Sequence, residues 1–264
     1  MSSSGPRTLS PGTRSSWPRR RLDPDHSLGL RLTLAAAGAF LVLVPFALLA
    51  LFVLSSSSPL HRWDATVTDR LHGWALDRPG WTRFLNVWTD VFGPLPLRVA
   101  ALVLVVWLVR RQARRLALWV TVTMVVGGLL GPLLKLLVGR DRPDLLDPVA
   151  HATGYAFPSG HALNAALAAG VLLVVFLPSA VAPARRVALW VAALVLVGLT
   201  GFTRVALGVH WTSDVMGGWL LGAAVVAATT AAFTTWRHRV DLPPVRVTGD
   251  GGDPGERDAP RRFG

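Results

Sequence analysis

Five long stretches of this chain contain no charged residue, and this feature constrains its fold most strongly. They cover residues 32–60, 116–134, 162–184, 187–203 and 215–236. A helix needs about 20 mostly apolar residues to cross a membrane, and roughly 17 already suffice. Each stretch is therefore a candidate transmembrane helix, because a helix satisfies its own backbone hydrogen bonds inside lipid.

A sixth and shorter apolar stretch, residues 93–109, is interrupted only by Arg98. We count it as a span, since an arginine near a helix end can extend its charged head to the membrane interface. The composition agrees, because 52% of the residues are hydrophobic and only 16% are charged, against about 25% charged in soluble domains. We expect an all-α, integral membrane bundle of six transmembrane helices over residues 31–237.

Arginine is unevenly distributed around these stretches. It clusters in residues 7–31, 110–115, 185–186 and 237–262, which share one side of a six-span protein. The side richer in arginine is cytoplasmic by the positive-inside rule. We therefore expect a multi-pass protein of the cell membrane with both termini cytoplasmic. The net charge of +12 is then explained by topology, and no nucleic-acid partner is expected.

The segments outside the spans differ in character. Residues 1–30 and 238–264 are rich in Ser, Pro, Gly, Asp and Arg, which predicts disordered cytoplasmic tails. In the outer segment 59–92, Trp74, Trp81 and Trp88 recur every seven residues and so share a helical face. Pro79 and Gly80 are expected to divide this segment into two short helices. It either lies on lipid through its tryptophans or packs them against the bundle.

Three polar clusters follow the third span, precede the fourth and precede the sixth. The first runs from Lys135 through Arg140 to Arg142 and Pro143, and its cations are compatible with simple membrane anchoring. The second is Pro158-Ser159-Gly160-His161, where Ser159 is placed to cap a helix whose free N–H groups can bind an anion.

The third cluster contains Arg204, His210 and Asp214. His210 and Asp214 are four residues apart, so on a helix the carboxylate can accept the imidazole N–H. That contact fixes the tautomer and leaves the other ring nitrogen free as a base or nucleophile. A simple surface His–Asp pair is the alternative for this cluster by itself.

The predicted topology places all three clusters on the outer side of the membrane. Fixed cations and backbone N–H groups suit a phosphate, and two histidines suit a nucleophile and a general acid. In this order, Lys-x6-Arg-Pro, Pro-Ser-Gly-His and Arg-x5-His-x3-Asp resemble the motifs of the type 2 phosphatidic acid phosphatase family, a relative of bacterial acid phosphatases and vanadium haloperoxidases. The resemblance covers about residues 95–225. Thr203 departs from it, because the family usually has serine before the arginine.

The resemblance implies a membrane lipid phosphatase that forms a phosphohistidine and needs no metal or other cofactor. His210 would attack phosphorus, Asp214 would orient it, and His161 would protonate the leaving group. The phosphate-binding residues implied are Lys135, Arg142, Ser159, Gly160 and Arg204.

The implied partners are membrane lipids, including a lipid phosphate substrate such as phosphatidate or a polyprenyl pyrophosphate. The pattern leaves the substrate and the oligomeric state open. The alternatives are a non-catalytic lipid-phosphate binding or transport protein and a vanadate-dependent haloperoxidase.

Overall fold

The computed structural model describes all residues except 1–23, 56–58, 146–148, 151 and 241–264. The described residues form helices and connecting turns without a β-strand. The helices are α1 (Pro24–Leu54), α2 (Pro59–Leu76), α3 (Pro79–Val91), α4 (Pro94–Arg110), α5 (Arg114–Val138), α6 (Gly160–Phe176), the 3-10 turn η1 (Leu177–Ser179), α7 (Pro183–Ala206) and α8 (Thr212–Val240).

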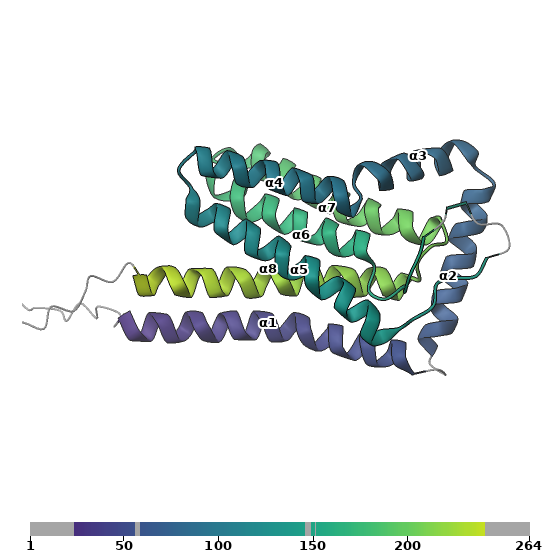
Figure 1. The fold of residues 1–264 in the computed structure, drawn as a ribbon, viewed down its shortest axis with the longest axis horizontal. Coiled ribbons are helices and arrows are strands. Elements are labelled where there is room, and N and C mark those ends of the chain that lie inside the picture. The colour runs from purple at the N-terminus through teal and green to yellow at the C-terminus, as the bar shows by residue number, and fades with distance from the viewer. Residues whose placement is uncertain (1–23, 56–58, 146–148, 151, 241–264) are drawn as a thin grey trace, which may run out of the picture.

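The long helices form a bundle in which α8 packs against both α1 and α6 (Figure 1). The helix α6 also packs against α7, and α4 packs against α5. The helix α2 stands across one end of this bundle, at 88° to the preceding part of α1. The described ends of the chain, in α1 and α8, both lie at the opposite end (Figure 1).

Four helical segments are long and apolar enough to cross a membrane. They are Arg114–Val138, Gly160–Ser179, Pro183–Ala206 and Thr212–Trp236. Two bent pairs also qualify if each pair is taken as one span, namely α1 with α2 and α3 with α4, the latter bent by 42°. By length and composition, the described residues thus provide four candidate spans, or up to six. They form an all-helical bundle of membrane-spanning character, while the count of six stays a prediction.

The first charge-free stretch does not continue as one helix to residue 60. The helix α1 ends at Leu54, where the Ser55 hydroxyl donates to the Phe52 carbonyl oxygen. The next helix, α2, begins at Pro59, because proline fits the first turn of a helix, where its missing N–H is not needed. Most of both predicted tails lies outside the described residues, although α1 already begins at Pro24 and α8 continues to Val240.

The outer segment forms two helices, α2 and α3, with Pro79 as the first residue of the second. The buried face of α2 is mainly polar and consists of Asp64, Thr68, His72 and Ala75. Trp63 and Trp81, by contrast, are 46% and 55% exposed. The most exposed tryptophans of this segment therefore face away from the protein, while polar side chains of α2 face its interior.

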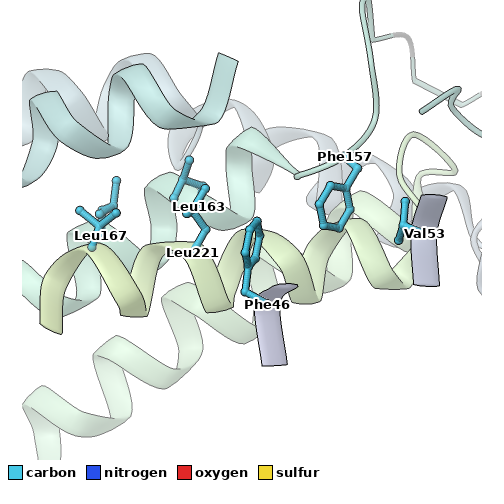
Figure 2. Close-up of a cluster of buried hydrophobic side chains, with 7 residues drawn as sticks. Phe46, Val53, Phe157, Leu163, Leu167 and Leu221 are labelled. Carbon is cyan, nitrogen blue, oxygen red and sulfur yellow. The ribbon is translucent and has the colours of Figure 1, made fainter. Parts of the chain in front are cut away.

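An apolar cluster supports the loop that leads into α6 (Figure 2). Phe157 is fully buried, and its ring stacks on that of Phe46 from α1 with 5.9 Å between centroids. On α8, a Cβ added to Gly218 would lie 2.6 Å from the Ser159 carbonyl oxygen. The missing side chain lets α8 approach the start of α6, and this brings the second and third polar clusters together.

Candidate phosphate-binding site

The three polar clusters meet at the end of the bundle that α2 covers. The backbone N–H of Ala156 donates to the Arg140 carbonyl oxygen at 2.8 Å and so joins the first cluster to the second. The backbone N–H of Ser159 donates to the Asp214 carbonyl oxygen at 2.9 Å, which joins the second to the third. The structure therefore brings together motifs that lie far apart in the sequence.

His210 lies in a tight turn between α7 and α8, not on a helix as we expected. The backbone N–H groups of Val209 and His210 both donate to the Arg204 carbonyl oxygen at 3.2 Å. Gly208 has a φ of +70°, and a Cβ there would lie 2.3 Å from Leu145 Cδ1. Glycine is suited to this conformation and close approach. The turn holds His210 just before α8, whose first turn carries Asp214.

The turn still pairs His210 with Asp214. Nδ1 of His210 lies 3.4 Å from Asp214 Oδ2, which also accepts the backbone N–H of Trp211 at 2.9 Å. On the other edge of the ring, Nη1 of Arg142 lies 3.1 Å from His210 Nε2. Arginine has only donors, so Nε2 is the acceptor and Nδ1 carries the hydrogen toward Asp214.

Both His210 and Asp214 are buried, with exposed fractions of 2% and 0%. Burial lowers the pKa of His210 well below its ordinary value of 6.5, and the charges of Arg142, Arg204 and Lys135 lower it further. His210 is therefore neutral in this site at physiological pH. Burial also lowers the pKa of Arg142, against the opposing charge of Asp214.

Arg142 and Lys135 are held by backbone carbonyl oxygens of the loop before α6 and, for Arg142, also by one of the turn before α8. Arg142 donates through Nε to Gly154 at 2.8 Å and through Nη1 to the Val209 carbonyl oxygen at 2.6 Å. Nζ of Lys135 donates to the carbonyl oxygen of Tyr155, and that of Ala156 lies 3.5 Å away. These contacts fix two cations beside His210.

The buried polar atoms without a hydrogen-bond partner among the described residues include Ser159 Oγ and Arg204 Nε. Nη1 of Arg204 donates to Thr89 Oγ1 at 2.8 Å. Ser159 occupies the N-cap position of α6, but its side chain does not form the cap hydrogen bond that we expected. A buried donor without a partner costs about 1–3 kcal/mol. The free hydroxyl and guanidinium N–H are thus available to an anionic ligand.

His161 and Gly160 begin α6 at the same place. A Cβ built on Gly93, at the corner between α3 and α4, would lie 3.5 Å from His161 Nε2. A Cβ on Gly160 would meet nothing within 4 Å, so there is open space beside its backbone. Each sequence-predicted site residue therefore lies at this end of the bundle.

Sequence reasoning assigned no functional role to Arg140, Ser213 or Asp64. These residues belong to one hydrogen-bond network with Asp214. Arg140 donates to Asp214 Oδ1 at 2.7 Å and to Asp64 Oδ2 at 2.8 Å, and Ser213 lies between the two carboxylates. For Arg140 the sequence offers only the membrane anchoring that is compatible with all cations of the first cluster. Asp64 lies in the outer segment, where the tryptophan spacing was the dominant signal. The polar i, i+4, i+8 pattern of Asp64, Thr68 and His72 was the signal that could have found it.

Comparison with known proteins gives one family match and several similar proteins. Residues 116–238 match the family model described as PAP2 superfamily. The chain is 41% identical to phosphatidylglycerophosphatase B of Bacillus subtilis over 97 residues, which are 36% of this chain and 46% of that protein. It is 31% identical to undecaprenyl-diphosphatase of Sulfolobus acidocaldarius over 123 residues, 44% of this chain and 54% of that protein.

Two further similarities complete the comparison. A lipid A 1-phosphatase of Rhizobium johnstonii is 33% identical over 120 residues, 42% of this chain and 45% of that protein. The chain thus spans about half the length of the curated relatives it matches. The fold is that of the crystal structure of a transmembrane PAP2 type phosphatidylglycerolphosphate phosphatase from Bacillus subtilis, with a TM-score of 0.63 and 24% identity over 79% of this chain and 99% of that one.

Proposed function

We propose that the protein is a membrane lipid phosphatase of the PAP2 superfamily, whose family model matches residues 116–238. It would hydrolyse a phosphomonoester or pyrophosphate bond on a lipid. The main support for this proposal is the environment of His210, whose Nε2 faces Arg142 while Nδ1 faces the buried Asp214. A neutral imidazole held in this tautomer presents a lone pair among fixed cations, which suits attack on an anionic phosphorus centre.

The proposed first step transfers the phosphoryl group to His210. The Nε2 lone pair forms a bond to phosphorus while the bond from phosphorus to the lipid oxygen breaks. His161 gives its proton to the leaving oxygen, and the phosphate dianion beside it favours the protonated imidazole before that transfer. The positive charge that develops on His210 is balanced by Asp214.

In the second step, water attacks the phosphohistidine. His161 takes a proton from the water, a new P–O bond forms, and the P–N bond breaks to release inorganic phosphate and neutral His210. Lys135, Arg142 and Arg204 would hold the equatorial oxygens throughout, together with the Ser159 hydroxyl and the Gly160 N–H. Fixed donors of this kind stabilise transition-state charge without reorganisation. The steps use no metal, in agreement with the family resemblance.

The proposed orientation follows from the positions of the arginines. The turn between α4 and α5, with Arg110 and Arg111, lies at the same end of the bundle as the described ends of the chain (Figure 1). The His210 turn lies at the other end. With the arginine-rich end in the cytoplasm, the active site opens on the outer side of the cell membrane.

The test is phosphate release by the purified protein in EDTA from a panel of phosphatidate, phosphatidylglycerol phosphate, undecaprenyl pyrophosphate and lipid A. We expect release from at least one lipid, and loss of at least about a thousandfold in His210→Ala, the scale seen when a catalytic nucleophile is removed. Failure on all four lipids, or full activity of His210→Ala, would contradict the proposal. Tight lipid-phosphate binding without turnover would favour a binding protein, and halide oxidation with vanadate and peroxide would favour a haloperoxidase.

A further inference from the structure

A buried ion network joins the outer helix α2 to the residue that orients His210. Asp64 of α2 is fully buried. Its Oδ2 accepts a hydrogen bond from Arg140 Nη2 at 2.8 Å, while Arg140 Nη1 donates to Asp214 Oδ1 at 2.7 Å. One guanidinium thus bridges two carboxylates, and Asp64 lies outside all three sequence motifs.

Ser213 completes this network. Its backbone N–H donates to Asp64 Oδ1 at 2.9 Å, and its hydroxyl contacts Asp64 Oδ2. The same hydroxyl oxygen accepts a hydrogen bond from Arg140 Nη1 at 2.7 Å. The side chains of both Asp64 and Asp214 have 0% exposure, and Arg140 only 8%. Water therefore contributes little screening to these charges.

The charge of the network is what matters for chemistry at His210. Two carboxylates and one guanidinium carry a net charge of −1. If Arg140 faced Asp214 alone, the pair would be neutral and would offset little of the positive charge that His210 acquires on phosphorylation. By sharing Arg140, Asp64 leaves Asp214 held in place but not fully neutralised.

We propose that Asp64 is a positioning residue that sets the charge on the Asp214 side of His210 by sharing Arg140 with Asp214. The inference rests on the proposed function, since it concerns the rate of phosphoryl transfer. Asp64 touches no reacting atom and acts through Arg140 and Ser213. A purely structural alternative is that Asp64 only fastens α2 to the end of the bundle.

The test makes the net charge of the Asp64–Arg140–Asp214 network more positive in one variant and more negative in another. It uses the full-length protein in lipid nanodiscs. Asp64→Asn changes the network to 0, Arg140→Gln changes it to −2, and the double variant restores −1. We expect Asp64→Asn to lower kcat about tenfold, within the range of coupling between residues of one network. Inorganic phosphate should inhibit this variant at least as strongly as it inhibits the wild type, because its surroundings become more positive.

The double variant provides the decisive comparison. If the net charge controls the rate, kcat of the double variant should exceed that of either single variant. If the substitutions only damage packing, its kcat should be no higher than that of the slower single variant. Asp69→Asn removes the same charge from an exposed position of α2 and should behave as wild type.

Three outcomes would overturn the inference. They are a kcat of Asp64→Asn within about twofold of wild type, a double variant no faster than the slower single variant, or parallel loss of kcat and phosphate inhibition in Asp64→Asn. If wild type and Asp69→Asn release phosphate, any of these outcomes contradicts the role proposed for Asp64 and leaves the proposed phosphatase function standing. If the wild type is inert on the lipid panel, the proposed function fails, and this inference fails with it.

Discussion

Arg142 donates a hydrogen bond to Nε2 of His210, with 3.1 Å between the two nitrogens. Because a guanidinium has no acceptor, this contact places the lone pair of the ring on the edge that faces the cations. Asp214 at the opposite nitrogen holds the hydrogen of that tautomer. The two contacts together select which nitrogen attacks phosphorus, and the predictions below depend on that selection.

The first prediction concerns pH. The folded-state pKa of His210 is depressed by burial and by Arg142, Arg204 and Lys135. Its reactive neutral form therefore persists below pH 6.5, and is lost only when pH falls through the lower folded-state value. The acid limb of kcat/KM assigned to His210 should lie well below pH 6.5.

Ionisation of the substrate phosphate also contributes to the acid limb of kcat/KM, so a variant is needed to separate its contribution from that of His210. In Arg204→Gln one of the charges that lowers the pKa of His210 is absent, and the limb should move to higher pH while substrate ionisation stays unchanged. A limb that stays in place would show that it belongs to the substrate alone.

The second prediction concerns the single lysine. Among 27 basic residues only Lys135 is not arginine, and its ammonium lies near two backbone carbonyl oxygens before α6. A compact ammonium can direct its donors to the carbonyls and to a phosphate, whereas a planar guanidinium is larger and its donors are fixed in one plane. Lys135→Arg should lower kcat/KM by about tenfold, equivalent to ~1.4 kcal/mol. A fully active Lys135→Arg protein would make the lone lysine a coincidence.

The third prediction concerns Thr203, where the family usually has serine. The Thr203 hydroxyl donates to the Thr200 carbonyl oxygen at 2.7 Å and is buried. Its hydroxyl therefore bonds within α7 and does not contact the site. Thr203→Ser keeps this hydrogen bond and should have a kcat within about twofold of wild type, since residues outside the reacting centre rarely cost more when the contact is kept. A tenfold loss would indicate that the methyl group positions Arg204.

The fourth prediction concerns the orientation of the protein in the membrane. The chain contains no cysteine, so a single introduced cysteine can be labelled without background. Asp144 is exposed at the active-site end, and Ala182 is exposed in the connection between η1 and α7. In whole cells, a membrane-impermeant maleimide should label Asp144→Cys but label Ala182→Cys only after lysis. The reverse pattern would invert the proposed topology.

Much of the bundle was predictable because lipid imposes a simple rule on sequence. Apolar stretches without charge correspond to α5, α6, α7 and α8 within a few residues at most ends, since a helix in lipid must be apolar over a fixed length. The exception is the first stretch, which ends at Leu54 and resumes in α2. Four serines, residues 55–58, stand between Leu54 and Pro59. They carry no charge, so the absence of charged residues alone gave no signal of the break.

The site was predictable only in part, for reasons that differ between residues. Lys135, Arg142, His210 and Asp214 belong to short motifs with fixed spacing. Asp64 and Arg140 form a pair across 76 positions of sequence, and no local pattern reports such a contact. The turn before α8 was also missed, because spacing of four residues fits both a helix and the observed Gly208 turn.

The most direct test of the central claim is to trap the phosphoenzyme. Purified protein would be mixed with a lipid substrate labelled with ³²P, quenched within milliseconds at alkaline pH, and digested for peptide mapping. We predict an acid-labile label on the peptide that contains His210, and no label in His210→Ala. Wild-type turnover with the label on another residue, or equal labelling of His210→Ala, would contradict the assignment of His210 as the nucleophile.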